Sequence, residues 1–550
     1  MLKITTPRIF FFDCIRRTEY LYACKSRFSN MAEPPSKRRR LSDTDEDHTV
    51  KKSGELPTSL SHPISPPPPR KTVARERKLI SSPIRLTTIR DLPEESNIDA
   101  VSLHDLLGDP LISECWEFNY LHDVDFLMNH FDEDTRTLVK VHIVHGFWKK
   151  DDNNRLSLER QSAQHNNVTL HTAYMPEIFG THHSKMLVLF RHDDTAQVII
   201  HTANMISKDW TNLTNGVWQT PQLPLLTKSQ NSSEPDLKIG SGSRFKNDLL
   251  NYLRAYNSKR NICRSMVEEL KKYDFSAVRG TLIASIPGRH DLYDDDPSTT
   301  FWGWAGIKHA LRSVPVHTGE SDIVVQISSI ATLAPTDKWL QRTLFDSLSP
   351  PTKPKAPRPT FKVIFPTPDE IRRSLDGYAS GGSIHTKIQS ATQTKQLHYM
   401  KPLLHHWAND CEKGEREEGE SRDGGRNRAA PHIKTYIRYN DNKSIDWALL
   451  TSANVSHQAW GAATDGTATI RIASWEIGVL MWPELFDANA TMVGTFMKDM
   501  PTDEGLDSDG PLVGLRVPYS LPLQKYDDSE LPWVATATYT QPDSKGCVWG

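Results

Sequence analysis

The chain has 550 residues, of which 37% are hydrophobic and 24% charged, a composition typical of a globular protein with room for two or three domains and tails. No run approaches the roughly 18 apolar residues that span a bilayer, which argues against a membrane-embedded role. With a net charge of −2, any nucleic-acid surface must be a local basic patch. The six cysteines lie far apart with no CxxC pair, which predicts free thiols and no structural zinc site.

Residues 1–95 are expected to form a disordered tail, because they contain prolines, serines and mixed charges but no sustained hydrophobic period. Within it, Lys37-Arg38-Arg39-Arg40 predicts a nuclear-import signal, and a solvated charge run is the alternative. Residues 1–30 contain Arg and aromatic residues but few acids, as in a mitochondrial presequence, whereas Met31 is an alternative start of translation. We therefore expect a nuclear protein, with a mitochondrial fraction as the alternative.

The folded part is expected to begin near Ser102 and to alternate helical and β patterns. Three loops are expected to be inserted and mobile, because their composition cannot bury surface: 228–242, 350–359 and 411–429. Helical spacing occurs at 103–107, 124–131, 245–256, 265–273 and 305–312, and β-rich runs occur at 138–145, 186–191, 197–201, 323–327, 361–364, 432–439 and 447–450. This alternation predicts an α/β fold with two domains, 96–318 and 319–550.

An internal repeat contains the candidate chemistry. Each copy has a His-x-Lys motif that opens one β run and an Ala-Asn pair that ends the next, at near-equal spacing. The residues are His183, Lys185 and Asn204 in the first copy and His432, Lys434 and Asn454 in the second. A single His-x-Lys is more often part of a surface strand than of a catalytic site, but the matched copies favour a catalytic interpretation.

Two such motifs provide the groups that phosphodiester cleavage needs. Residues i and i+2 of a strand lie on one face, so each His-x-Lys places an imidazole beside an ammonium group. If the strands face one another, one neutral His can attack phosphorus while the other protonates the departing oxygen. Lys and Asn can stabilise charge on the non-bridging oxygens. We therefore expect neither a metal nor another cofactor.

These motifs resemble the phospholipase D superfamily, in which an Asp follows the Lys by five positions. Phe190 and Tyr439 occupy the two Asp positions in this chain. Because both Asp residues are absent, the chain is similar to the tyrosyl-DNA phosphodiesterase family in particular. The resemblance spans roughly residues 100–550. It is carried by the strings at 118–120, 180–185, 381–383, 431–436, 451–454 and 475–480. It implies two similar phospholipase D-like α/β domains around one shared active site.

The resemblance also implies roles for individual residues. His183 would be the nucleophile and His432 the general acid and then the general base, while His182 would be only a neighbour. Glu476 would orient His183, and an ordinary strand-end carboxylate is the alternative. The other implied catalytic residues are Lys185, Lys434, Asn204 and Asn454. The implied DNA contacts are Tyr120 and Phe179, whose alternative is a place in the core, and Ser329, Ser383 and Ser456.

Two positions depart from the family pattern. Asn215 stands where the family has Gln, and Ala535 stands where an aromatic residue is expected two positions after Trp533. The first departure leaves the role of Asn215 open. The second is expected to change the C-terminal edge of the part of the site that binds the peptide.

The function that the resemblance implies is DNA repair. A monomeric enzyme would hydrolyse the bond between a topoisomerase I tyrosine and a DNA 3′ phosphate, and would also act on other 3′ adducts. Its partners would be single- and double-stranded DNA and the tyrosyl peptide, without a membrane. The reaction would pass through a phosphohistidine and leave a 3′-phosphate. The alternatives are a phospholipase D-like nuclease or lipid phosphodiesterase, and a DNA-end-binding scaffold without catalysis.

Overall fold

The computed structural model describes residues 77–227, 235–351, 356–410, 419–464, 467–503 and 510–550. The chain divides into two units, 1–76 and 77–550, and every element below belongs to the second. The expected import signal at 37–40 and the presequence-like residues 1–30 lie outside the described residues, as do parts of the three expected loops.

The expected limit of the tail at residue 95 is wrong, because folded structure is already present from residue 77. β1 (Leu79–Ile80) and β2 (Ile84–Leu86) each join a sheet, and a 3₁₀ turn follows at Glu94–Asn97. Ile84 and Leu86 are buried in the core. Strands of two or three residues are too short to produce a hydrophobic period, so the sequence pattern does not reveal them.

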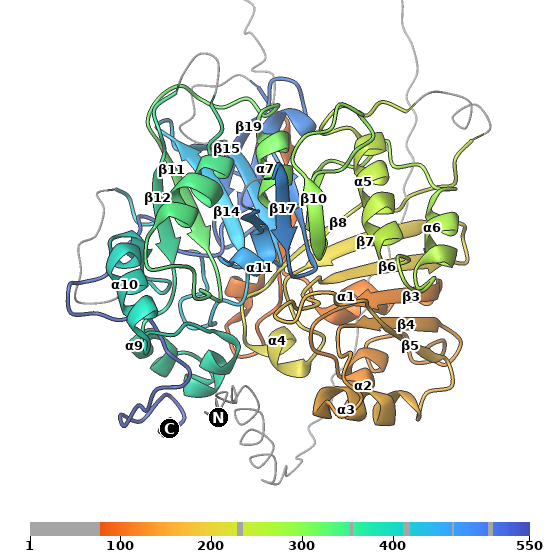
Figure 1. Ribbon diagram of the computed structural model, residues 1–550, viewed down its shortest axis with the longest axis horizontal. Coiled ribbons are helices and arrows are strands. Elements are labelled where there is room, and N and C mark those ends of the chain that lie inside the picture. The colour runs from red at the N-terminus through yellow and green to blue at the C-terminus, as the bar shows by residue number, and fades with distance from the viewer. Residues whose placement is uncertain (1–76, 228–234, 352–355, 411–418, 465–466, 504–509) are drawn as a thin grey trace, which may run out of the picture. The chain divides into compact units, whose positions relative to one another are not determined.

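The first half of the described chain forms a sheet between two helical layers (Figure 1). On β6, Met186 and Val188 pack in the same cluster as α5, whereas Leu187 and Leu189 pack in the cluster of α1 to α3. Both faces are therefore buried, which explains the continuous apolar run. The sheet order is β2, β8 (Gly216–Gln219), β7 (Ala196–His201), β6 (Met186–Arg191), β3 (Ile112–Phe118), β4 (Lys140–His145) and β5 (Val168–Thr172). The helices are α1 (Leu103–Leu107), α2 (Val124–Met128), α3 (Asn153–Ser162), α5 (Gly242–Ala255) and α6 (Arg264–Leu270).

The second half forms a larger sheet. Its main order is β1, β20 (Leu512–Arg516), β19 (Thr491–Thr495), β15 (Ser444–Thr451), β14 (Thr435–Asn440), β11 (Ser321–Gln326), β12 (Thr360–Ile364) and β13 (Leu404–His405). β15 also pairs with β18 (Glu476–Met481), which pairs with β9 (Thr281–Ser285). A separate ribbon contains β10 (Gly288–Asp291), β17 (Thr469–Ile472) and β16 (Ala462–Ala463).

The remaining helices are short and connect the strands. They are α4 (Ser207–Thr211), α7 (Gly303–Leu311), α8 (Asp346–Leu348), α9 (Pro368–Arg372), α10 (Ala391–Met400) and α11 (His457–Trp460). A π-helical turn covers Leu340–Phe345, and 3₁₀ turns cover Gly377–Ser383, Lys401–Leu403 and Pro483–Leu485. In the described part of the chain, no helix is both long and apolar enough to cross a membrane.

The two sheets contain the same six-strand arrangement. The order β8-β7-β6-β3-β4-β5 of the first sheet corresponds to β18-β15-β14-β11-β12-β13 of the second. Directions also correspond, since the last three strands of each series run parallel and the others pair antiparallel. In each series the His-x-Lys motif therefore precedes the same central strand.

The tertiary structure differs from two expectations about the second half. β9 precedes the expected domain boundary at 318, but it pairs with β18 of the second half. Sheet pairing depends on which strand edge is near in space and not on position in the sequence. In the expected loop 411–429, Arg426 and Ala429 are buried. The carbonyl of Ala429 accepts a hydrogen bond from Thr214 Oγ1 of the first half, so this end of the loop is part of the interface between the sheets.

Candidate active site

The two His-x-Lys motifs lie in extended segments directly before β6 and β14, and not within the strands as expected. The reason is that their backbone groups pair with the opposite half. The His183 amide donates to the carbonyl of Trp475 at 3.0 Å, and the His432 amide donates to the carbonyl of Thr214 at 3.0 Å. The histidine of each motif is thereby held against the opposite half, whereas the carbonyl of its lysine still accepts a hydrogen bond from its own sheet, from the amide of His201 for Lys185 and of Thr451 for Lys434.

His183 is held by a carboxylate from the second half. Its Nδ1 lies 2.9 Å from Oε2 of Glu476, which also accepts a hydrogen bond from the Ser452 hydroxyl. Burial lowers the pKa of His183, and Glu476 opposes this only in part. Burial alone would raise the pKa of Glu476, but His183 and Ser452 outweigh it and leave the pKa below its usual value. The pair is therefore a neutral imidazole that donates from Nδ1 to a carboxylate, which leaves Nε2 with a free lone pair.

His432 is held by two groups from the first half. Its Nδ1 lies 3.1 Å from Oδ1 of Asn215 and 3.2 Å from Oδ2 of Asp209. Burial lowers the pKa of His432 well below its usual value, and the ammonium groups of Lys434 and Lys185 lower it further. Asn215 thus reaches the histidine although its side chain is shorter than Gln, and Asp209 supplies a second acceptor.

The two lysines are buried beside their histidines. Lys185 Nζ donates to the carbonyl of His183 at 3.2 Å, and Lys434 Nζ donates to the carbonyl of His432. Burial lowers the pKa of Lys185 to about 8. The pKa of Lys434 is lowered well below its usual value, first by burial and then by the charge of Lys185. The lysines therefore lie close enough to repel one another, and an anion between them would relieve that repulsion.

The two asparagines of the repeat are oriented by neighbouring groups. Asn204 donates from its backbone amide and from Nδ2 to Oδ2 of Asp209, at 2.7 and 2.9 Å, and its own Oδ1 has no partner among the described residues. Asn454 Oδ1 accepts from the backbone amides of Ser328 and Ser329, at 3.0 and 2.9 Å. Because this oxygen is occupied, the amide NH₂ of Asn454 is oriented to donate elsewhere.

The expected neighbour role of His182 agrees with its contacts. Its Nδ1 lies 2.8 Å from the carbonyl of Asn119 and its Nε2 lies 2.9 Å from the Tyr256 hydroxyl, so both nitrogens are occupied. The side chain is buried, and burial lowers its pKa to about 3. It is therefore neutral at physiological pH.

The candidate DNA contacts of the first half differ in exposure. The ring of Tyr120 lies edge-on to the His183 imidazole, with ring centroids 5.7 Å apart, so it is a wall of the site. Phe179 is 72% exposed and belongs to no core cluster. An aromatic ring left in water four residues before His183 is available for stacking.

The three candidate serines come from the second half. The Ser329 amide holds Asn454, and Ser456 caps α11 through a 3.0 Å hydrogen bond from the Ala459 amide. Ser383 ends the 3₁₀ turn at Gly377–Ser383, which Lys208 of the first half contacts by donating to the carbonyl of Ala379 at 2.6 Å.

Trp533 supports the turn that contains Ser383. Its Nε1 donates to the carbonyls of Gly381 and Ile384, at 2.9 and 3.2 Å. Ala535 is buried, and its carbonyl accepts from Trp549 Nε1 at 2.8 Å. Trp549 therefore packs beside the position where the family has an aromatic residue.

The sequence interpretation did not identify Asp209, Ser452 and Trp533 as parts of the site. Asp209 follows Asn204 by five residues, and a buried acid there carries no repeat signal because the second copy has no acid at the equivalent position. Ser452 adjoins the recognised Ala-Asn pair. Only the contacts of these three residues in the tertiary structure reveal which groups of the site they orient or support.

The described residues contain no group of three or more His, Cys, Asp or Glu side chains arranged to hold a metal ion. The polar groups of the site are two imidazoles, two buried ammonium groups, the amides of Asn204, Asn215 and Asn454, and the carboxylates of Glu476 and Asp209 that hold the histidines. Such a set can bind a phosphate group, attack it and transfer protons to and from its oxygens.

Comparisons with known proteins agree with this chemistry. A family model described as tyrosyl-DNA phosphodiesterase matches residues 83–527. A Schizosaccharomyces pombe protein named probable tyrosyl-DNA phosphodiesterase is 31% identical over 562 residues, which cover 88% of this chain and 99% of that protein. Tyrosyl-DNA phosphodiesterase 1 of Drosophila melanogaster is 30% identical over 464 residues, covering 82% and 73%. The crystal structure of the yeast tyrosyl-DNA phosphodiesterase has a similar fold, with a TM-score of 0.58 at 19% identity, covering 82% and 99%.

Proposed function

Because the chain belongs to the tyrosyl-DNA phosphodiesterase family and is a phosphodiester hydrolase, we propose that it removes tyrosyl peptides from DNA 3′ ends. The adduct is the active-site tyrosine of topoisomerase I, and other 3′ blocking groups are further substrates. The observation that carries this proposal is the reciprocal arrangement at the site, where each histidine of one half is held by acceptors of the other.

In the first step His183 attacks the phosphorus atom. Its Nε2 lone pair forms the P–N bond, and the bond between phosphorus and the tyrosyl oxygen breaks. His432 donates its proton to that oxygen, which matters because tyrosine, with a pKa near 10, is only a moderate leaving group. The products are free tyrosyl peptide and DNA joined through its 3′ phosphate to His183.

The proton on His432 depends on the substrate. In the free enzyme His432 is neutral, because burial and the two lysines lower its pKa. A phosphodiester anion between Lys185 and Lys434 offsets their charge, which raises the pKa of His432 towards protonation. Acid catalysis is therefore available when the substrate is in place.

In the second step water releases the DNA. Neutral His432 takes a proton from water, the water oxygen attacks phosphorus, and the P–N bond to His183 breaks. The DNA leaves with a 3′-phosphate, His183 is neutral again, and His432 carries the proton taken from water, which it loses to solvent when the product departs. During both steps the ammonium groups of Lys185 and Lys434 and the amides of Asn204 and Asn454 stabilise charge on the phosphoryl oxygens.

The DNA strand is proposed to lie across both halves. Ser329, Ser383 and Ser456 would bind its phosphates, which positions the strand without reading its bases. Tyr120 and Phe179 would contact sugars and bases, where stacking tolerates any sequence. The enzyme would act as a monomer on single- and double-stranded DNA in the nucleus, with a mitochondrial fraction as the alternative.

The test is cleavage of a 3′-phosphotyrosyl single-stranded oligonucleotide in the presence of EDTA. We expect a 3′-phosphate product with undiminished rate, and His183→Ala should abolish turnover while DNA binding remains. Inhibition by EDTA that magnesium reverses would contradict the lysine-based mechanism. Cleavage of phosphatidylcholine but not of the oligonucleotide would favour a lipid phosphodiesterase. If the wild type binds DNA but cleaves nothing, a scaffold would be favoured.

A further inference from the structure

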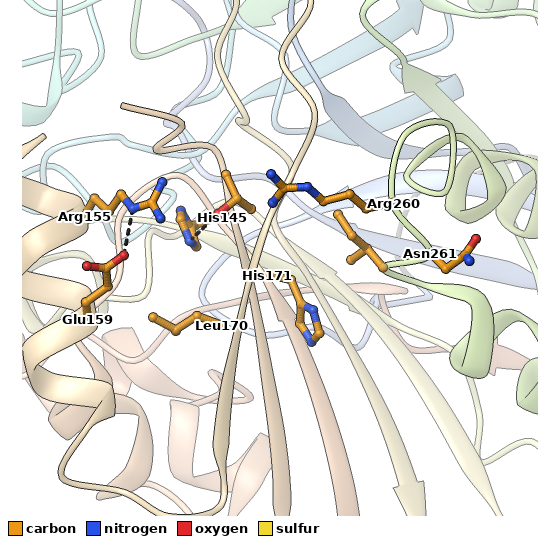
Figure 2. A pocket seen from close by; sticks show the side chains of 9 residues that line it. His145, Arg155, Glu159, Leu170, His171, Arg260 and Asn261 are labelled. Carbon is orange, nitrogen blue, oxygen red and sulfur yellow. Dashed lines mark hydrogen bonds and ion pairs between the residues drawn. The ribbon is translucent and has the colours of Figure 1, made fainter. Parts of the chain in front are cut away.

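A cavity of about 480 Å³ lies in the first half, outside the site described above (Figure 2). It opens between the ends of β4 and β5, helix α3 and the segment that links α5 to α6. The polar residues that line it are His145, Arg155, Glu159, His171, Thr172, Arg260 and Asn261. Figure 2 places Arg155 and Arg260 on opposite sides of His145.

The cavity carries an uncompensated positive charge. Arg155 Nε donates to Oε1 of Glu159 at 2.7 Å, so this pair is neutral overall. Arg260 is exposed, and its guanidinium forms no hydrogen bond or ion pair with any residue that the structure describes. Burial lowers the pKa of His145 to about 3 and that of His171 to about 4, so both imidazoles are neutral. A guanidinium presents planar donors that match phosphate oxygens.

Two exposed aromatic rings with cations above them lie close in the chain to lining residues of the cavity, Trp148 three positions after His145 and Tyr174 two positions after Thr172. Trp148 is 55% exposed and lies under Lys149, whose Nζ is 5.3 Å from the ring centroid. Tyr174 is 42% exposed and lies under Lys259, at 5.6 Å. Lys259 precedes Arg260 in the chain. Aromatic rings interleaved with cations on one surface are typical of nucleic-acid binding, where rings stack on bases and cations bind phosphates.

Short contacts connect this surface to the active site. The carbonyl of Tyr174 accepts a hydrogen bond from Nε1 of Trp475 at 3.2 Å, and Trp475 directly precedes Glu476. On the other side, Gly146 follows His145 and packs on His182, so closely that a Cβ at Gly146 would lie 2.4 Å from the Cβ of His182. One layer of residues therefore separates the cavity from the segment that carries the nucleophile.

We propose that the cavity binds a backbone phosphate of the DNA strand that is not cleaved, so that the enzyme holds a duplex end. This inference rests on the proposed function. In the binding mode proposed above, the cleaved strand ends at His183, where Tyr120 and Phe179 contact its sugars and bases, and its phosphates extend along the serines of the second half. A phosphate held in the first half, beyond Tyr174, therefore belongs to the other strand. Stacking of that strand on Trp148 or Tyr174 would explain why these rings are exposed.

The test uses Arg260→Gln in the full-length chain, with Arg312→Gln as the matched control. Arg312 is an exposed residue at the end of α7, outside the cavity. A 3′-phosphotyrosyl strand is cleaved in single turnovers, alone and annealed to a complement. We expect Arg260→Gln to raise the half-saturating enzyme concentration about 3- to 10-fold for the duplex only, with the maximal rate unchanged. The slope of the logarithm of duplex-binding affinity against the logarithm of salt concentration should decrease by the equivalent of about one phosphate contact. Arg312→Gln should behave as wild type.

Several outcomes would overturn the inference. An equal effect on the single strand would assign the cavity to the cleaved strand, and an effect only with a long tyrosyl peptide would assign it to the peptide. If inorganic phosphate raises the melting temperature of wild type but not of Arg260→Gln, and duplex binding is unaffected, the ligand is free phosphate. Unaltered behaviour in every assay would also overturn it. In contrast, failure of the wild type to cleave the single strand would overturn the proposed function itself.

Discussion

Oδ2 of Asp209 lies 3.2 Å from Nδ1 of His432, and the two residues come from opposite halves of the fold. The same exchange occurs in the other direction, because His183 of the first half pairs with Glu476 of the second. Each histidine is therefore oriented only when the two sheets are assembled. A change that separates the halves should disable both histidines together.

Asp209→Asn should lower kcat for a tyrosyl substrate by about 10², the lower end of what general acid–base catalysis contributes, because His432 loses its anionic acceptor. The loss in the rate of the first step, measured as formation of the covalent complex, should be smaller with a nitrophenyl leaving group, because that group needs little protonation. Circular dichroism and Asp295→Asn, an exposed residue, serve as controls. An equal loss in that step with both leaving groups would indicate a structural role instead.

Asn215→Gln, which introduces the family's residue, should reduce stability and activity. Asn215 is fully buried, its Oδ1 accepts from Thr202 at 2.8 Å and its Nδ2 donates to the carbonyl of Asp209 at 2.8 Å. An extra methylene in a packed site costs about 1 to 3 kcal/mol. Urea denaturation measures this change. An active variant of unchanged stability would show that the site has room for Gln.

His432→Ala should trap the enzyme on DNA. With a nitrophenyl leaving group the first step needs little acid, but hydrolysis of the phosphohistidine still needs a base. A slow-migrating covalent band should therefore accumulate on a denaturing gel. The band should be absent from His183→Ala. If the His432 variant never traps DNA, or if trapping survives the loss of His183, the assigned roles are wrong.

The pH profile of kcat/KM should be shifted to low pH on both sides. His183 must be neutral to attack, and its lowered pKa places the acid limb below pH 6.5. Lys185 and Lys434 must both be charged. The pKa of Lys185 is about 8 and that of Lys434 is also lowered well below its usual value, so activity is lost by the time the pH has risen through about 8. A phosphodiester does not titrate in this range. An alkaline limb near pH 10.5 would show that Lys185 is not perturbed in the working enzyme.

Replacement of Lys37, Arg38, Arg39 and Arg40 with Ala should reduce nuclear accumulation, because a contiguous basic cluster is the expected import signal. Fluorescence microscopy of the tagged full-length chain measures the effect. Alanine at Lys51 and Lys52 is a control in the same tail that removes two positive charges instead of four. Unchanged accumulation in the first variant would rule out the cluster as the signal.

Much of the fold followed from local pattern. The apolar run at 186–191 and the helical spacing at 245–256 agree with β6 and α5, because burial of a strand or helix face leaves a period in the chain. The short strands β1 and β2 and the pairing of β9 with β18 did not follow, because two- or three-residue strands have no period and sheet partners are not encoded locally.

The sequence by itself determined which groups are available for reaction, because the paired His-x-Lys and Ala-Asn motifs repeat in order and spacing. Only the tertiary structure decided which acceptor holds which histidine. His183 and Glu476 are 293 positions apart and His432 and Asn215 are 217 apart, yet each pair lies within about 3 Å. Hydrogen bonds over such separations depend on how two sheets pack, and buried acceptors such as Asp209 leave no periodic signal in the chain.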